Sequence, residues 1–239
     1  MAWSCLLWGS AAVCQDRAVS VHVKVKDGEA AEGHKELQAE KDASEVVIWL
    51  KPLDLDTGGA NPAQSSGKKV RVVQKNKSFQ PHLTVVRVGS VVEFPNHDPF
   101  FHNVFSLFDG KRFDLGLYEA GATNSVRFDH VGVSYLFCNI HPEMSAVVVA
   151  VDSSYYGISS KTGLVNIAGV PDGRYEMHVW YERGVQDELK GLTRAVRISA
   201  ETRDLGLVAV VADPAFTPAH KNKYGQDYAP PPKGGYSPQ

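Results

Sequence analysis

The residues with the clearest capacity for chemistry stand in one short segment, Phe137–Met144, which reads Phe-Cys-Asn-Ile-His-Pro-Glu-Met. It places the thiol of Cys138, the imidazole of His141 and the thioether of Met144 within seven residues, directly after an apolar stretch. Thiolate and thioether sulfurs are soft ligands that suit copper, whereas zinc normally takes another Cys, His or carboxylate. The segment therefore predicts three ligands of a copper site.

A second imidazole would complete a trigonal His₂Cys set with a weak axial Met, the ligand pattern of blue copper. His102 is the natural source, because the 36 residues that separate it from Cys138 allow about two or three strands to run out and back. His97 stays open as a surface group or an alternate ligand. We interpret His82 as structural and assign no role to the scattered histidines His22, His34, His130, His178 and His220.

The first residues indicate where the protein works. Met1–Val13 is apolar and rich in small residues, which predicts a secretory leader over residues 1–17 and a periplasmic or secreted protein; a buried first strand is the alternative. Cys5 and Cys14 would leave with that leader, so Cys138 would stand alone. A lone thiol is a liability in an oxidising compartment unless something such as a metal occupies it.

The elements that must position these residues are strands. Helix signals are scarce, and short β-branched and aromatic runs bounded by Gly, Pro, Asn and Asp predict an all-β protein. Turn signals about every eight to twelve residues favour a Greek-key sandwich over 68–152. We expect N-terminal strands and a mobile loop within 18–67, further strands over 153–212, and a disordered or polyproline-like tail over 213–239.

The ligand residues carry a resemblance to a known family. His-Asn-Val at 102–104 together with Cys-x₂-His-x₂-Met at 138–144 resembles the cupredoxins, in particular plastocyanin and amicyanin. The resemblance covers about a third of the chain. It implies one type 1 copper ion with His102, Cys138 and His141 as equatorial ligands and Met144 as the axial ligand. It also implies supporting roles for Asn103, which would tie the ligand loops together, and for Pro142.

A second resemblance concerns the strands around the copper region. The pattern from Gly163 to Trp180 is similar to that of transthyretin-like, carboxypeptidase-regulatory β-sandwiches. The two strands expected to precede that pattern stand instead before the copper region, at 21–28 and 43–50. We therefore expect the copper domain to be inserted between the two halves of a second small β-sandwich. A plain β-sandwich is the alternative interpretation.

These features predict a protein that carries single electrons between periplasmic partners, such as a cytochrome or an oxidoreductase. The resemblance extends to methylamine-utilisation proteins, which leaves the pathway open. We expect no enzyme activity, because four protein ligands leave little room for substrate, and a multicopper oxidase would need further His-rich motifs. A copper-delivery protein is the alternative, although delivery sites favour exposed clusters and this chain has only three Met. A structural protein with an incidental site is a third interpretation.

Composition narrows the partners. The formal net charge is −2, from 25 basic and 27 acidic residues, which gives no reason to expect nucleic acid. No apolar run of about 18 residues predicts a membrane span. Apolar cover over the copper could come from Phe100, Phe101, Phe105, Pro142 and Met144. The resemblance to the cupredoxins implies that an apolar patch over His141 is the electron port for a transient partner.

Overall fold

The computed structural model describes residues 18–28, 42–54, 69–107 and 110–228. The predicted leader, most of the predicted mobile loop and the end of the tail lie outside these ranges. Among the described residues the regular elements are strands, apart from one short helix, α1 (Gln186–Gly191), that the sequence analysis did not predict. The predicted all-β fold class is confirmed. Within the described ranges no helix is long and apolar enough to cross a membrane.

One β-sandwich is built from the middle of the chain. Its larger sheet has the strand order β6-β12-β11-β8-β9, and its smaller sheet has the order β10-β7-β3. A separate hairpin joins β4 to β5. The bounds are β3 Val70–Arg71, β4 Val73–Lys75, β5 Ser78–Gln80, β6 Leu83–Arg87, β7 Val91–Pro95, β8 His102–Ser106, β9 Phe113–Tyr118, β10 Thr123–Arg127, β11 Gly132–Phe137 and β12 Ser145–Val151.

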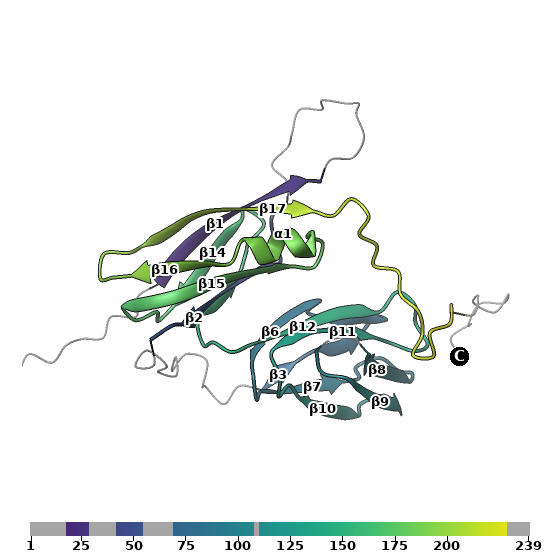
Figure 1. Cartoon of the computed structure of the whole chain (residues 1–239). Helices are drawn as coiled ribbons and strands as arrows, with labels where there is room; N and C mark the ends of the chain where they lie inside the picture. Colours follow the sequence, from purple (N-terminus) through teal and green to yellow (C-terminus); the bar gives the residue numbers. More distant parts are fainter. Residues whose placement is uncertain (1–17, 29–41, 55–68, 108–109, 229–239) are drawn as a thin grey trace, which may run out of the picture.

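A second group of strands packs into another sandwich. Its sheets have the orders β14-β1-β17 and β13-β2-β15-β16. The bounds are β1 Ala18–Asp27, β2 Val46–Pro52, β13 Tyr156–Ile158, β14 Leu164–Ala168, β15 Gly173–Tyr181, β16 Arg194–Ile198 and β17 Asp204–Ala212. Alternating exposure along β1 follows from the period of two in a strand and turns its valines to the core. Figure 1 shows this group above the strands of the first sandwich.

The second sandwich takes strands from both sides of the first in sequence. β2 pairs with β13 and β15, and β1 pairs with β14 and β17, so strands before residue 53 join strands after residue 155. Pairing of β2 with strands of the first sandwich alone would have contradicted the insertion hypothesis. The resemblance of this second sandwich to transthyretin-like modules stays a prediction.

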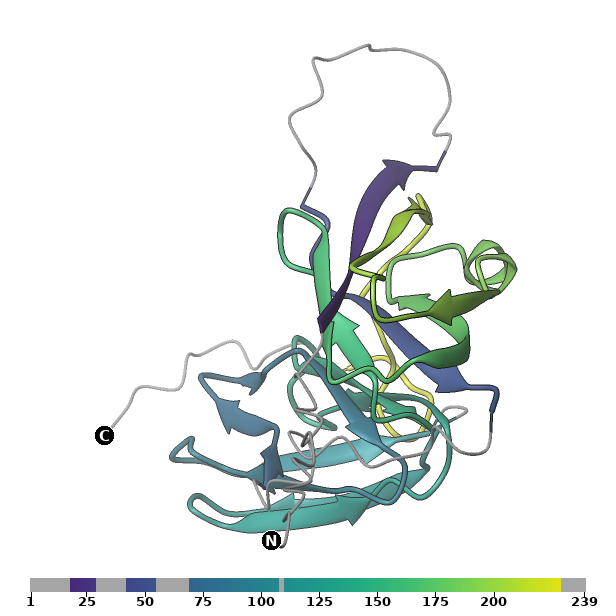
Figure 2. The ribbon, with the colours of Figure 1, turned by 90° about the vertical axis from the view of Figure 1, so that its left-hand side faces the viewer.

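The two sandwiches meet through an apolar layer and a polar tie. The layer joins β6 and β12 to β2 and β15, and its buried members are Val47, Leu83, Val85, Val147, Val149, Val151 and Trp180. At its edge His82 Nε2 lies 2.7 Å from Glu182 Oε2, and His82 Nδ1 lies 3.2 Å from the Ser145 carbonyl oxygen. Figure 2 shows the two groups of strands one above the other in the turned view. His82, interpreted as structural, is thus a link between them.

The C-terminal segment differs from the expected disordered tail in the part that the structure describes. After β17, residues 213–228 run from the second sandwich to the end of the first near β8 and β9 (Figure 1). Hydrogen bonds hold a compact turn there, from Asn222 N–H to the Gln226 carbonyl and from Gly225 N–H to the Asn222 carbonyl. Composition predicted little burial for this segment, but it contacts a sandwich that lies far away in sequence.

The link between the sandwiches should make stability depend on pH. The Glu182 carboxylate, as acceptor of a hydrogen bond from His82, raises the pKa of that histidine above its usual value, against the effect of burial. Stabilisation is therefore complete below the unfolded pKa of about 6.5 and is lost as pH rises through the higher folded pKa. Denaturant unfolding should show Glu182→Gln destabilised more at pH 6 than at pH 9.

A matched control is Glu119→Gln, at an exposed position of the first sandwich. It should change the free energy of unfolding little at either pH. An effect of Glu182→Gln that is the same at both values would contradict the ion pair.

Candidate metal centre

The candidate ligands meet because neighbouring strands run in opposite directions. His102 is the first residue of β8, and Cys138 directly follows β11. β8 and β11 pair antiparallel, with Phe137 opposite Phe105, so the start of one strand lies beside the end of the other. His141 lies in the loop that leads from β11 to β12. The structure thus brings to one place two residues that are 36 positions apart.

The distances suit one metal ion. Nδ1 of His102 lies 3.9 Å and Nδ1 of His141 lies 3.6 Å from Cys138 Sγ, and all three atoms lie within 4.8 Å of one another. Bonds of about 2.0 Å to nitrogen and about 2.3 Å to sulfur, as at zinc, would place two trigonal ligand atoms roughly 3.5–3.7 Å apart. His102 and Cys138 are fully buried, and His141 is half-buried. The donor set and its spacing fit a thiophilic metal of the copper or zinc class.

Met144 lies at the foot of the same loop. Its backbone carbonyl accepts a hydrogen bond from Cys138 N–H at 3.3 Å, and its own N–H donates to the His141 carbonyl at 3.1 Å. The Met144 side chain is fully buried in the apolar core that also contains Cys138. These contacts close the loop from Cys138 to Met144 into a compact unit, with the thioether buried in the same apolar core as the thiol.

A buried carboxylate holds the ring of His102. His102 Nε2 lies 2.8 Å from Asp98 Oδ2, which leaves Nδ1 to face Cys138. The Asp98 carboxylate also accepts hydrogen bonds from the backbone N–H groups of Asn76 and Lys77, at 2.7 and 2.9 Å. Those two residues have φ values of 56° and 52° and form the turn between β4 and β5, so both N–H groups point at one anion.

Sequence reasoning missed Asp98. Its position four residues before His102 was a usable signal, but the backbone donors come from a hairpin twenty-odd residues away and show only in the fold. Burial raises the pKa of Asp98, yet the hydrogen bonds from Lys77, His102 and Asn76 outweigh it and hold this pKa below its usual value. The carboxylate is therefore charged and can accept a hydrogen bond from the His102 ring. A hydrogen bond of this kind fixes the orientation of a histidine ring at metal sites.

The surroundings of Cys138 and of His141 shift the pKa values of these two side chains in opposite directions. Burial raises the pKa of Cys138, while backbone N–H groups of Ile140, Asn103 and His141 point to the sulfur and oppose that rise. Burial, and then the charge of His102, lower the pKa of His141, so its ring is neutral at pH 7. A metal cation binds a neutral imidazole and a thiolate. The neutral ring of His141 and the N–H donors that favour the thiolate of Cys138 therefore suit metal binding.

The side chains of Asn103 and Phe105, two residues expected near the site, face away from the ligands. The Asn103 side chain donates to Asp114 Oδ1 at 2.7 Å and to the Gly116 carbonyl at 2.9 Å, while its backbone N–H faces Cys138. Phe105 packs on Phe137 with ring centroids 5.9 Å apart and gives no cover to the ligands. Both side chains lie on the opposite face of β8 from His102, because successive strand residues alternate.

The remaining expected neighbours lie at the surface of this end. Phe100 is 36% exposed, and its ring centroid lies 5.2 Å from that of His102 and 5.6 Å from that of His141. Phe101 and Pro142 are exposed. His97 is exposed and does not belong to the group of ligand atoms. Of the two interpretations for His97, the geometry favours a surface group.

The similarity of this chain to known proteins is limited to part of its length. No family model and no curated protein matches the chain. Solved structures similar to part of it include a purple cupredoxin from Nitrosopumilus maritimus, at 21% identity and a TM-score of 0.32, covering 35% of this chain and 100% of that one. A mutant of amicyanin with Cu(I) gives 18% identity and a TM-score of 0.34, covering 44% of this chain and 98% of that one.

A third similar structure is the copper-containing nitrite reductase NirK from Thermus scotoductus SA-01. It gives 22% identity and a TM-score of 0.34, and the match covers 42% of this chain and 25% of that one. One of these proteins is a cupredoxin by name, and the names of the other two mention copper. Because the TM-scores are low, a function for this chain must rest on the geometry of its own site.

The Asp98–His102 contact generates a prediction about metal affinity. Asp98→Asn keeps the shape of the side chain but weakens the acceptor of the hydrogen bond from His102, so affinity for Cu(II) or Zn(II) should fall about 10- to 100-fold in a chelator competition titration. Asp129→Asn is the control, because Asp129 lies 2.7 Å from His130 Nδ1 in a similar carboxylate–histidine pair away from the ligands. Equal affinities in the two variants would show that Asp98 does not support the site.

Proposed function

We propose that this protein is a type 1 copper protein that carries single electrons, with His102, Cys138, His141 and Met144 as the ligands of one copper ion. The observation that carries the proposal is the convergence of one thiol sulfur and two imidazole nitrogens within 4.8 Å at a buried strand end. Soft sulfur and borderline imidazole donors in this combination favour copper over magnesium or calcium. Copper bound there would supply a one-electron couple.

The protein's own residues would keep electron transfer to and from a bound copper ion fast. His102, Cys138 and Met144 are each fully buried, so water has little access to the ligands. Asp98 fixes the His102 ring, and the backbone bonds between Cys138 and Met144 fix the loop. Side chains held by packing and hydrogen bonds move little when the charge of a bound ion changes, which lowers the reorganisation cost of electron transfer.

The surface near His141 supports docking of a transient partner. Phe100, whose ring centroid lies 5.6 Å from that of His141, is 36% exposed, and Ile140, which precedes His141, is 44% exposed. Exposed apolar side chains beside a half-buried ligand make a contact surface that needs no strong charge. We propose a redox protein of the periplasm, such as a cytochrome or an oxidoreductase, as the partner and the periplasm as the location.

The first test adds Cu(II) to the purified protein. We expect an intense thiolate-to-copper absorption band and the electron spin resonance spectrum of a type 1 site, because Cys138 binds through its thiolate. Cys138→Ser should abolish the band. Weak copper binding without colour in the parent protein would favour the copper-delivery alternative, and no copper binding would reject both.

The second test concerns Met144. Met144→Gln should keep the copper but lower its reduction potential, because an amide oxygen is a harder axial donor that stabilises Cu(II). Met144→Leu has similar volume without a donor and should raise the potential. Potentials measured by redox titration that stay equal in all three proteins would show that Met144 is not the axial ligand.

A further inference from the structure

The C-terminal segment contacts the candidate ligand loop from outside. Lys223 N–H donates to Asn139 Oδ1 at 3.0 Å, and the Tyr228 hydroxyl donates to the Cys138 carbonyl at 2.7 Å. The ring of His220 stacks on Phe137 with centroids 4.0 Å apart and an interplanar angle of 29°. Three consecutive residues, from the end of β11 into the loop, thus each have a partner in a segment more than eighty positions later.

The contacts with the loop support one another. Tyr228 Oη also lies 3.2 Å from Nδ1 of His220, so the ring that stacks on Phe137 and the phenol that holds Cys138 are joined. The Asn222–Gln226 turn stiffens the segment between them, with Asn222 Oδ1 accepting from the N–H groups of Tyr224 and Gln226.

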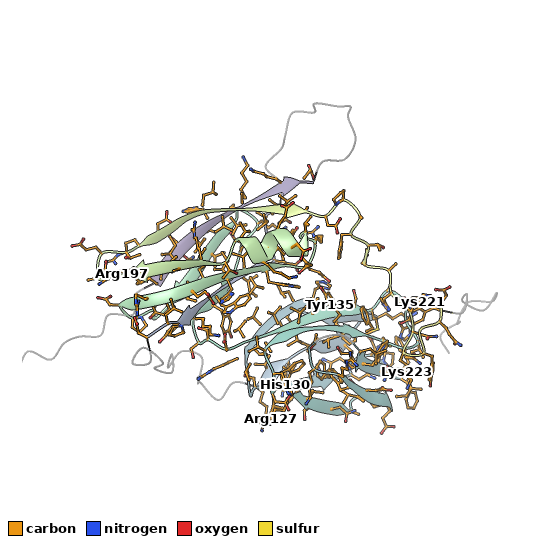
Figure 3. All side chains as sticks on the ribbon, viewed as in Figure 1. Arg127, His130, Tyr135, Arg197, Lys221 and Lys223 are labelled. Carbon is orange, nitrogen blue, oxygen red and sulfur yellow. The ribbon has the colours of Figure 1, made fainter. Side chains whose placement is uncertain are left out.

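A second arm reaches the sulfur by way of β9. Lys223 Nζ lies 2.7 Å from Asp114 Oδ2, and the other oxygen of Asp114 accepts from the Asn103 side chain. Asn103 in turn points its backbone N–H at Cys138. In Figure 3 Lys221 and Lys223 lie at one end of the first sandwich, and His130 lies toward the other. The segment therefore contacts the loop after β11 directly and reaches β8 through Asp114 of β9.

From these contacts we propose that residues 220–228 are a strap that fixes the Cys138–Met144 loop, with Tyr228 and Lys223 as positioning residues for the copper site. This inference rests on the proposed function for the identity of the metal. The contact between strap and loop itself needs no metal. The strap gives the second sandwich a physical connection to the site, although the described residues of that sandwich contribute no candidate ligand.

The test compares hydroxyl removal at two tyrosines of the strap. Tyr228→Phe deletes the donor to Cys138, whereas Tyr224→Phe makes the same change at a side chain that is 70% exposed. In the metal-free protein, alkylation of Cys138 by iodoacetamide, located by peptide mass spectrometry, should be about two- to tenfold faster in Tyr228→Phe, as expected for one lost hydrogen bond. Tyr224→Phe should react like the parent.

The same variants loaded with Cu(II) test the positioning role. A looser loop lets copper relax toward the tetragonal geometry that Cu(II) prefers. Tyr228→Phe should therefore show a larger parallel hyperfine splitting in electron spin resonance and lose copper faster to excess chelator, and Tyr224→Phe should show neither change. Copper properties identical in the two variants would overturn the positioning role.

Lysine variants test the second arm independently of any effect on folding at Tyr228. Lys223→Met should accelerate Cys138 alkylation, Lys223→Arg should restore the parent rate through its ion pair with Asp114, and the neighbouring Lys221→Met should have no effect. Alkylation at the parent rate in both Tyr228→Phe and Lys223→Met would overturn the strap. Lack of a copper band in every protein would instead reject the proposed function, while the alkylation rates would still decide whether the strap holds the loop.

Discussion

The antiparallel pairing of β8 with β11 is the constraint on which the site depends. Pairing of Phe137 with Phe105 sets the register, and this register places His102 beside the loop that begins at Cys138. A slip of one residue would turn the His102 side chain to the opposite face, because strand side chains alternate. The strand core behind these residues, with Val104 and Leu136 fully buried, holds the register in place.

Around this pairing the chain adds supports from distant parts of the sequence. Two backbone N–H groups of the β4–β5 hairpin donate to Asp98, and Asp98 in turn holds Nε2 of His102. The loop closes on itself between Cys138 and Met144. Asp98 fixes His102, and the loop contacts fix Cys138 and Met144. The positions of these candidate ligands are therefore set without a metal. Preorganisation of this kind suits a centre that must keep one geometry in two oxidation states.

The second sandwich has no group of candidate metal ligands among its described residues. Its contribution is mechanical: it packs on β6 and β12 through a layer that includes Trp180 and sends residues 213–228 across to the far end of the first sandwich. An open pocket lies beside this segment and is lined by residues of both sandwiches and of the segment, among them Tyr135, Glu182 and Phe216. The segment therefore reaches the ligand loop over a gap between the sandwiches, held by specific polar contacts at its end.

The sequence by itself determined the all-β class and singled out the four side chains, because their chemistry is rare and their spacing is local or set by strand length. Alternating patterns also marked β1 and β15, and a continuous apolar run marked β12, whose side chains are almost all buried. The sequence further paired the strands at 21–28 and 43–50 with the pattern after Gly163, a pairing that depends on motif order.

Only the tertiary structure decided which groups stand behind those ligands. Asp98 gains its role from backbone donors of a separate hairpin, and Asn103 keeps only its backbone toward the sulfur because its side chain faces β9. Tyr228 and Lys223 lie in a stretch whose composition predicts disorder, since composition measures what a segment can bury alone and not what a distant surface offers it. Hydrogen bonds between remote segments carry no periodic signal in sequence, so they emerge only when the strands are assembled.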